Sequence, residues 1–373
     1  MGSILILGTG SAQKDLINYC IDAGHKVYAC SNKKSIVAQN LGDRYISLDI
    51  KNGDAIVDFV KEKDIDYVYS IGSDIAMPTI AKTSKALNLS CFISEKTAIA
   101  CHYKSLFRRL IPSKFNINFL EVKDEQELNK WDIFPCIIKP TDSQGQRGVY
   151  KCLNRKQLVE HFNQAMRFSP SKSLIVEEYV QGDEISVNAY VVNKKLVLSF
   201  ISDRITYKEY PGGIVKEHIF PSKYEKNNLL KEKILSLVER CSSSLGIKNG
   251  PIYFQIKITK ELNVKLIEIT PRLDGCHLWR IIEITYGVNL LDITMRHLLN
   301  KNFKDINRNG KKVNVIPHSL KFLSQRPGTL MGQYDVSQKD KKVKYVDYFY
   351  NKGDCIQSVN GHMEKVGYYI VEE

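Results

Sequence analysis

The chain has 373 residues, and its 54 lysines and arginines outnumber its 41 aspartates and glutamates, which gives a formal net charge of +13. A chain of this length usually divides into two or three packed units. With 43% hydrophobic and 25% charged residues, the composition excludes a disordered chain, a collagen and a coiled coil as the main class. No apolar stretch approaches the ~18 residues of a membrane-spanning helix, so no membrane partner is expected.

The nine cysteines are spread along the chain with no CxxC pair, which argues against a zinc knuckle and against a disulfide framework. Reduced thiols of this kind predict a cytoplasmic protein. Met1-Gly2-Ser3 precedes the first apolar run without a basic leader, so no signal peptide is expected. The positive charge alone leaves open nucleic acid, an anionic surface or acidic small substrates as partners.

The first hundred residues alternate short apolar runs with amphipathic stretches, which predicts a parallel sheet with helices on its faces. The expected strands are Ile4–Leu7, His25–Cys30, Tyr45–Leu48 and Tyr67–Ile71, and the expected helices are Ala12–Ala23, Gly53–Lys63 and Pro78–Leu87. Gly8 and Gly10 follow the first strand, but Gln13 stands where a dinucleotide-binding motif has its third glycine. These glycines therefore predict a tight strand-to-helix turn.

From about Ile117 the pattern changes to strands, hairpins and two long helices. The expected strands are Pro135–Lys139, Val149–Leu153, Leu174–Val180, Ile185–Val192, Leu196–Ile201, Ile252–Ile258 and Val264–Ile269, and the expected helices are Arg155–Phe168 and Asn228–Leu245. Further helices are expected up to about Asn300. Asn302–Lys312 is polar and predicts a linker or loop, and a short β-rich tail closes the chain.

The first cluster with chemical character is a lysine at the end of an apolar strand, followed by a flexible loop. Lys139 leaves the strand, and Ser143, Gly145 and Gly148 lie in the loop. Backbone N–H groups of such a loop can bind phosphates while the lysine neutralises their charge. A surface hairpin with a solvated lysine explains the same residues equally well.

The second cluster is an apolar strand that ends in Glu177-Glu178-Tyr179-Val180, with Glu184 shortly after it. Free backbone groups at the end of an extended segment can bind an adenine edge. A carboxylate such as that of Glu184 can accept hydrogen bonds from ribose hydroxyls. An ordinary strand with an acidic turn is the simpler alternative for these residues alone.

The third cluster is the hairpin that ends in Thr270-Pro271-Arg272. With a four-residue turn over 260–263, Thr259 faces Val264 and Gln255 faces Glu268, and Glu268 shares a face with Thr270. Their oxygen atoms suit Mg²⁺ held together with nucleotide phosphates. The alternative is a half-buried hairpin whose polar face lies in water.

Together, in this order and spacing, the clusters resemble the ATP-grasp superfamily, particularly its branch with carbamoyl-phosphate synthase large-subunit domains, biotin carboxylase and carboxylate–amine ligases. The resemblance covers essentially the whole chain and implies an ATP-grasp fold of α/β class, with α+β character in the later domains. It implies a Rossmann-like pre-grasp domain over residues 1–100, an ATP-grasp domain over 101–300 with its lid at about 115–185, and a β-rich extension over 301–373 that packs on the grasp domain.

The resemblance also implies a role for each cluster. It implies ATP phosphate contacts from Lys104, Lys139, Ser143, Gly145 and Gly148, adenine contacts from Glu177, Glu178, Tyr179 and Val180, a ribose contact from Glu184, metal ligation by Gln255, Glu268 and Thr270, and catalytic roles for Arg272 and Lys139. Thr270 departs from the family, which usually has an asparagine there, and this change weakens the case for a second metal ion.

The implied activity is an ATP-dependent ligase that joins a carboxylate to an amine through an acylphosphate and releases ADP and phosphate. The implied cofactors are ATP and Mg²⁺, with Mn²⁺ as an alternative cation. The implied partners are small-molecule carboxylates and amines and a second copy of the chain, but no nucleic acid. A bicarbonate-using carboxylase or carbamoyl-phosphate-type enzyme and a non-catalytic nucleotide-binding regulator are the alternatives.

Two further features of the sequence bear on the substrate. Arg204 or Arg280 could hold a substrate carboxylate, and each could equally be a structural ion-pair partner. Cys276 and His277 are adjacent, but neighbouring residues rarely face each other, so a Cys–His nucleophile is not expected.

Overall fold

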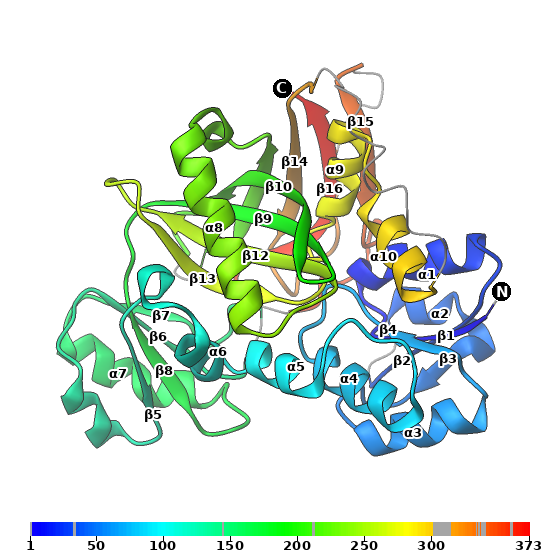
Figure 1. The fold of residues 1–373 in the computed structure, drawn as a ribbon, viewed down its shortest axis with the longest axis horizontal. Coiled ribbons are helices and arrows are strands. Elements are labelled where there is room, and N and C mark those ends of the chain that lie inside the picture. The colour runs from blue at the N-terminus through cyan, green and yellow to red at the C-terminus, as the bar shows by residue number, and fades with distance from the viewer. Residues whose placement is uncertain are drawn as a thin grey trace.

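The structure is a computed structural model that describes residues 2–32, 35–143, 145–210, 213–300, 315–332, 334, 336, 341–358 and 361–373. These residues form three sheets: a four-stranded parallel sheet, a second four-stranded sheet and an eight-stranded sheet. Figure 1 shows the parallel sheet at the right, the second sheet at the lower left and the eight-stranded sheet between and above them. The polar segment Asn302–Lys312 lies outside the described residues.

The N-terminal sheet has the strand order β3-β2-β1-β4, and its paired strands are all parallel, as predicted. Its strands are β1 (Ser3–Leu7), β2 (Lys26–Ser31), β3 (Tyr45–Ser47) and β4 (Tyr67–Tyr69), and its helices are α1 (Ser11–Asp22), α2 (Ile36–Gln39), α3 (Gly53–Glu62) and α4 (Ala76–Leu87). Strand β1 is covered on both faces, since Ile4–Leu7 are fully buried. Gly8 turns the chain at φ +109°, and the Gln13 side chain accepts a hydrogen bond from the Gly10 N–H, so the predicted turn is confirmed.

Two helices, α5 (Glu95–His102) and α6 (Lys104–Leu110), lead from this sheet to the second one. The second sheet has the order β5-β8-β6-β7 and is antiparallel throughout. Its strands are β5 (Phe119–Val122), β6 (Cys136–Pro140), β7 (Tyr150–Cys152) and β8 (Leu174–Glu178), and α7 (Arg155–Met166) packs on it. The sequence does not predict strand β5.

The eight-stranded sheet has the order β13-β12-β9-β10-β11-β14-β16-β15. Its strands are β9 (Asp183–Val192), β10 (Lys195–Thr206), β11 (Val215–Phe220), β12 (Gly250–Ile258), β13 (Val264–Thr270), β14 (His318–Gln325), β15 (Val343–Tyr348) and β16 (Glu364–Glu372). Strand β10 runs five residues past its predicted end, and the sequence does not predict β11. The three C-terminal strands continue the same sheet through the β11–β14 pair and stand at the top of Figure 1.

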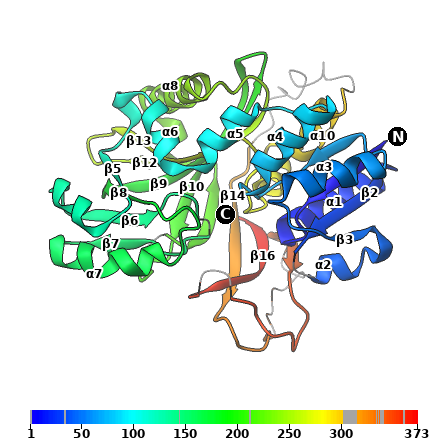
Figure 2. The same ribbon diagram turned by 90° about the horizontal axis from the view of Figure 1, so that it is seen from below.

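Helices cover the two faces of this large sheet differently. Helix α8 (Asn228–Ser244) buries an apolar stripe against one face. On the other face, α9 (Leu278–Tyr286) and α10 (Leu290–Leu298) join α1 in a core that reaches from the N-terminal sheet to the C-terminal strands. Figure 2 shows this junction from below, with the C-terminal strands projecting away from the N-terminal sheet and from the second sheet. Within the described residues no helix is long and apolar enough to span a bilayer.

Candidate active site

Strands β12 and β13 form the hairpin that the sequence predicts to hold a cation. Gln255 lies directly opposite Glu268, as predicted. Beyond this pair the register shifts by one residue, so Val264 faces Ile258, and the predicted pairing of Val264 with Thr259 is wrong. The shift is a β-bulge, which inserts one extra residue into β13 and which the length of the turn does not reveal.

Three side chains of this hairpin have an oxygen atom that no other described residue binds. The Glu268 carboxylate has no hydrogen-bond or ion-pair partner among the described residues and is partly exposed. The Gln255 amide donates to Glu184 at 2.9 Å, which leaves its own oxygen for another contact. The Thr270 hydroxyl is buried and has no hydrogen-bond partner among the residues described. These hard oxygen donors suit Mg²⁺, and because the described residues hold no cluster of three or more His, Cys, Asp and Glu side chains, such an ion would need further ligands from a bound molecule.

Lys139, at the end of β6, is held by a buried carboxylate on the neighbouring strand β8. The Lys139 Nζ lies 2.6 Å from one Glu177 oxygen, and the Arg108 Nε donates to the other at 2.8 Å. Burial alone would raise the pKa of Glu177, but the charges of Arg108 and Lys139 lower it to about 2. Glu177 is therefore an ionised group that fixes Lys139, and its side chain is not free to contact a nucleotide.

Arg108 extends this ion pair to the hairpin. Its guanidinium is fully buried and donates to the backbone carbonyls of Leu266 at 2.6 Å and Ile267 at 3.1 Å, both on β13. One buried arginine on α6 thus ties β8, which carries Glu177, to the strand that carries Glu268. The sequence analysis did not identify Arg108, because a helix that contains Arg108-Arg109 gives no sign which arginine faces inward.

Lys104 lies at the start of α6 and reaches the loop that follows Lys139. Its Nζ donates to the Ser143 carbonyl at 2.7 Å. Burial lowers the pKa of the Lys104 ammonium, the charge of Glu268 opposes that shift, and the charge of Lys139 adds to it. The structure therefore brings together Lys104, Lys139 and Glu268, which lie far apart in the sequence.

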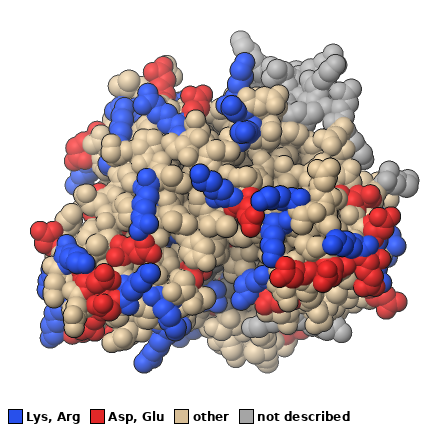
Figure 3. Space-filling model, turned by 60° about the horizontal axis from the view of Figure 1, so that its bottom comes forward, with Lys and Arg blue, Asp and Glu red and all other residues tan. Residues whose placement is uncertain are grey.

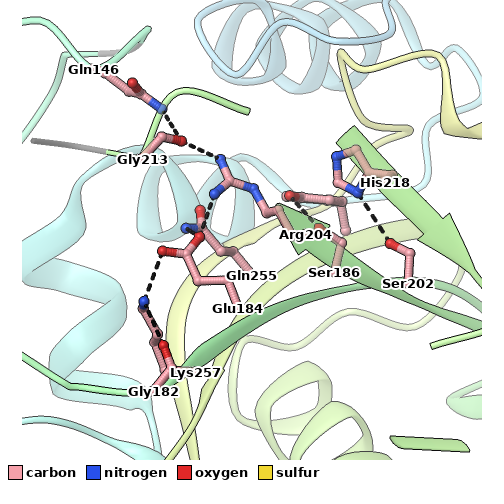
Figure 4. Close-up of polar contacts among 11 residues, drawn as sticks. Gln146, Gly182, Glu184, Ser186, Ser202, Arg204, Gly213, His218, Gln255 and Lys257 are labelled. Atoms are coloured by element: carbon pink, nitrogen blue, oxygen red, sulfur yellow. Dashed lines mark hydrogen bonds and ion pairs between the residues drawn. The ribbon is translucent and has the colours of Figure 1, made fainter. Parts of the chain in front are cut away.

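The loop between β6 and β7 has the backbone of a tight, glycine-dependent turn. Gly145 has φ +66° and Gly148 has φ +71°, and a Cβ on Gly148 would lie 2.9 Å from the Phe168 ring. Gln146, in the same loop, donates its side-chain N–H to the Gly213 carbonyl at 2.7 Å (Figure 4). The loop therefore reaches across to the segment between β10 and β11.

The predicted adenine-binding segment lies where β8 ends. The Tyr179 N–H donates to the Pro135 carbonyl at 3.0 Å, whereas Val180 makes no backbone hydrogen bond to any described residue. Glu178 accepts from the Asn118 side chain at 2.6 Å, and the ammonium of Lys151 lies 3.7 Å from the centre of the Tyr179 ring. Residues 178–181 line a cavity of about 270 Å³ with the β12–β13 turn. The backbone groups of Val180 are thus left for a ligand as far as the described residues go, and adenine binding by this segment stays a prediction.

Glu184 is the centre of a second buried charge network, drawn in Figure 4. Its carboxylate accepts from Arg204, from Lys257 at 3.0 Å and from Gln255 at 2.9 Å. Burial alone would raise the pKa of Glu184, but Arg204 and Lys257 lower it, so the group is ionised. The alternation along β12 that points Gln255 toward the site also points Lys257 there, so this lysine was identifiable from the sequence.

Arg272 follows β13 and binds an aspartate of the N-terminal part. Its Nε and one terminal nitrogen donate to the two oxygens of Asp74, each at 2.6 Å, and the other terminal nitrogen donates to the Leu273 carbonyl at 2.9 Å. The Gly72 N–H also donates to the Leu273 carbonyl, at 3.1 Å. No local pattern in the sequence indicates Asp74, because the contact joins residues 198 positions apart.

The other candidate residues of the sequence analysis do not lie together in one site. Cys276 contacts Lys365, whereas His277 pairs with Asp15, so the two adjacent residues form no nucleophile pair, as expected. Arg280 pairs with Glu283 on its own helix at 3.1 Å. Arg204, by contrast, lies in the network around Glu184.

Both the sequence and the fold of this chain are similar to those of known proteins. Residues 133–278 match the family model of the ATP-grasp domain. The carbamoyl phosphate synthase large chain of Thermoanaerobacter sp. (strain X514) is 23% identical over 325 residues, which are 81% of this chain and 29% of that protein. The chain thus spans less than a third of the length of the first curated relatives it matches.

Two solved structures share the fold over 100% of this chain. They are an L-amino acid ligase from Bacillus licheniformis (TM-score 0.82, 18% identity, 93% of that chain covered) and a phosphoribosylglycinamide synthetase from Anaerococcus prevotii (TM-score 0.77, 21% identity, 94% covered). The resemblance and the mixed α/β fold inferred from the sequence are therefore confirmed. Residues 133–278 therefore resemble an ATP-grasp domain, within a chain that shares the fold of these two proteins over its length.

Proposed function

We propose that the protein is an ATP-dependent ligase that joins a small-molecule carboxylate to an amine and releases ADP and phosphate. The observation that carries this proposal is the convergence of Glu268, which has no partner among the described residues, with Lys104, Lys139 and Arg272. An unpaired carboxylate among cations is the arrangement that a metal-bound triphosphate needs. The likeness to an L-amino acid ligase and to a phosphoribosylglycinamide synthetase supports the reaction class.

In this proposal the nucleotide lies between the small sheet and the hairpin. The backbone of residues 178–180 contacts adenine, and Glu184 accepts from the ribose. Lys104, Lys139 and the loop with Ser143, Gly145 and Gly148 contact the phosphates, while Glu177 acts only by fixing Lys139. Gln255 and Glu268 would hold Mg²⁺ or Mn²⁺, with Thr270 as a further oxygen donor, and the ion would neutralise phosphate charge.

The reaction then proceeds in two balanced steps. A carboxylate oxygen of the substrate attacks the γ-phosphorus, the bond to the β-phosphate oxygen breaks, and ADP leaves. The amine nitrogen attacks the carbonyl carbon of the acylphosphate, phosphate leaves with the bonding pair, and the amine loses one proton. Arg272 and Lys139 stabilise the charge on the phosphoryl group, and the loop from Ser143 to Gly148 excludes water, which would hydrolyse the acylphosphate.

A bicarbonate-using enzyme is the second candidate, because the chain is related to carbamoyl phosphate synthase large chains. Nucleic-acid binding has less support, since acidic side chains lie among the basic ones on the face seen in Figure 3. The cytoplasmic location, the homodimer and the three domain boundaries remain predictions.

The test measures ADP release with MgATP and a panel of carboxylates and amines, and uses hydroxylamine as the amine to trap an acylphosphate as its hydroxamate. The proposal expects ADP release that depends on a carboxylate, with one hydroxamate per ADP. ADP release that depends on bicarbonate instead would favour the second candidate. Nucleotide binding without turnover on any member of the panel would favour a regulator.

A further inference from the structure

Lys365, on the C-terminal strands, contacts Cys276, four residues after Arg272, and has no ion-pair partner within the described part of the chain. The Lys365 Nζ, on β16, donates to the Cys276 Sγ at 3.1 Å and lies 3.6 Å from the centre of the Phe322 ring. Among the described residues no carboxylate lies within ion-pair distance of this ammonium. A half-buried lysine held by a thiol and a ring retains a strong preference for an anion.

Two further side chains, on β10 and β11, present nitrogens that have no partner among the described residues. Arg204 on β10 lies directly opposite His218 on β11. The His218 Nδ1 shares a hydrogen bond with Ser202 at 3.2 Å, but its Nε2 is buried without a partner among the described residues (Figure 4). The Arg204 terminal nitrogens are bound to Glu184 and Gly213, whereas its Nε is likewise buried and unpaired within the described part of the chain. Arg204 is only 8% exposed and His218 is fully buried.

The four residues Arg204, His218, Cys276 and Lys365 form one cluster, which we name the Lys365 cluster. Burial lowers the pKa of His218 well below its ordinary value, and the charges of Arg204 and Lys365 add to this effect. Burial raises the pKa of Cys276, and the same two charges oppose the shift. The cluster therefore combines a neutral imidazole and a thiol with two cations, of which only Arg204 has a carboxylate partner among the described residues.

We propose that the Lys365 cluster binds an acidic group of the substrate other than the carboxylate that becomes phosphorylated. The inference rests on the proposed function. Glu268 on β13 and Arg204 on β10 are three strand spacings apart, about 14 Å between their backbones. Between them lies the Glu184 carboxylate, which accepts from both Gln255 and Arg204, so an acidic group bound at the Lys365 cluster is separated by this carboxylate from one bound at the proposed metal ligands. The substrate class is then a dicarboxylate or a phosphorylated carboxylic acid.

The test uses the thiol in the cluster as a reporter. Cys276 is partly exposed, and Cys355 is exposed and distant in sequence, so it serves as an internal reference. With MgADP present, glutarate or 3-phosphoglycerate should slow alkylation of Cys276 by iodoacetamide at least fivefold and leave Cys355 unchanged, as measured by peptide mass spectrometry. Butyrate, which has one acidic group, should protect neither thiol.

The matched variants are Lys365→Met and Lys344→Met. Methionine preserves the apolar stem over Phe322 and removes the charge, whereas Lys344 pairs with Glu372 on the surface of the same strands at 2.8 Å. Protection should disappear in K365M and persist in K344M. Glutarate should also raise the Tm of the wild type and of K344M but not that of K365M, and this measurement needs no thiol reaction.

Equal effects of glutarate and butyrate, or effects of glutarate that survive in K365M, would overturn the inference, as would no effect in either assay. Carboxylate-dependent ADP release together with any of these results would leave the proposed function intact. Conversely, Lys365-dependent protection without ADP release on any carboxylate would retain the anion site and overturn the ligase.

Discussion

The two faces of the eight-stranded sheet show how one strand serves stability and chemistry at the same time. Along β9, Ile185, Val187 and Ala189 are buried in the apolar core under α8. The alternate residues Glu184 and Ser186 face the polar network of the proposed site. Because side chains alternate with period two, a change on one face should leave the other nearly unaffected. The predictions below test that separation.

The largest expected effect is on the polar face. Glu268→Gln should lower kcat for ADP formation by about 100- to 1000-fold, the loss that follows removal of one preorganised electrostatic group. Its urea midpoint should stay close to that of the wild type, because Glu268 has no partner among the described residues. Glu217→Gln, at a half-buried carboxylate that pairs with Lys321 away from the site, is the control and should retain activity. Comparable activity of the two variants would contradict the site.

Arg108→Met removes a buried charge that bridges the two sheets. It leaves Glu177 with Lys139 alone and should cost about 3–5 kcal/mol of unfolding free energy. The neighbouring change Arg109→Met breaks an exposed pair with Glu121 and should cost at most about 1 kcal/mol. Urea denaturation of both variants checks this, and similar losses would show that Arg108 is not the bridge described.

On the apolar face, Leu237→Ala opens a cavity in the buried stripe of α8 and should cost about 2–5 kcal/mol. Because Leu237 lies on the face opposite the site, kcat of the folded variant should match the wild type. Leu229, in the same helix but 66% exposed, supplies the control Leu229→Ala, which should change neither quantity appreciably. A fall in kcat for L237A would show that the two faces are coupled.

The smallest effect concerns pH. The pKa of Glu177 is about 2 in the folded protein, against an ordinary value of 4.5, so folding favours the ionised form. The resulting stabilisation is present above pH 4.5 and is lost as the pH falls toward 2. Urea unfolding between pH 5 and 3 should therefore show a free energy of unfolding that decreases with falling pH. Glu177→Gln should reduce that slope, by at most about 1.4 kcal/mol per pH unit, and an unchanged slope would contradict the ionised pair.

The helices and strands with a regular hydrophobic pattern are predictable from the sequence. So are the residues that strand alternation places on one face. The predicted pairing of Gln255 with Glu268 is confirmed only because the β-bulge in β13 offsets the error at the turn, where the predicted register is one residue out. The predicted end of β10 at Ile201 is wrong, because Ser202, Asp203 and Arg204 interrupt the apolar run while the strand continues. One of the polar residues that conceal the true length of this strand is Arg204, which belongs to the network around Glu184.

Long-range partners are not predictable from one sequence. The resemblance assigns Glu177 to the nucleotide, but its partners Arg108 and Lys139 come from other elements. Asp74 and Lys365 carry no local pattern, and their importance follows only from what the fold places beside Arg272 and Cys276.

The contact at Gly72 packs the segment after β13 closely against the N-terminal part. A methyl group there would lie 2.8 Å from the Ala12 Cβ and 3.1 Å from the Gly275 Cα, so the two segments have no clearance to slide past each other. A bulkier residue at Gly72 would therefore push the segment that follows Arg272 away from the N-terminal part and would misalign Arg272 without touching any ligand.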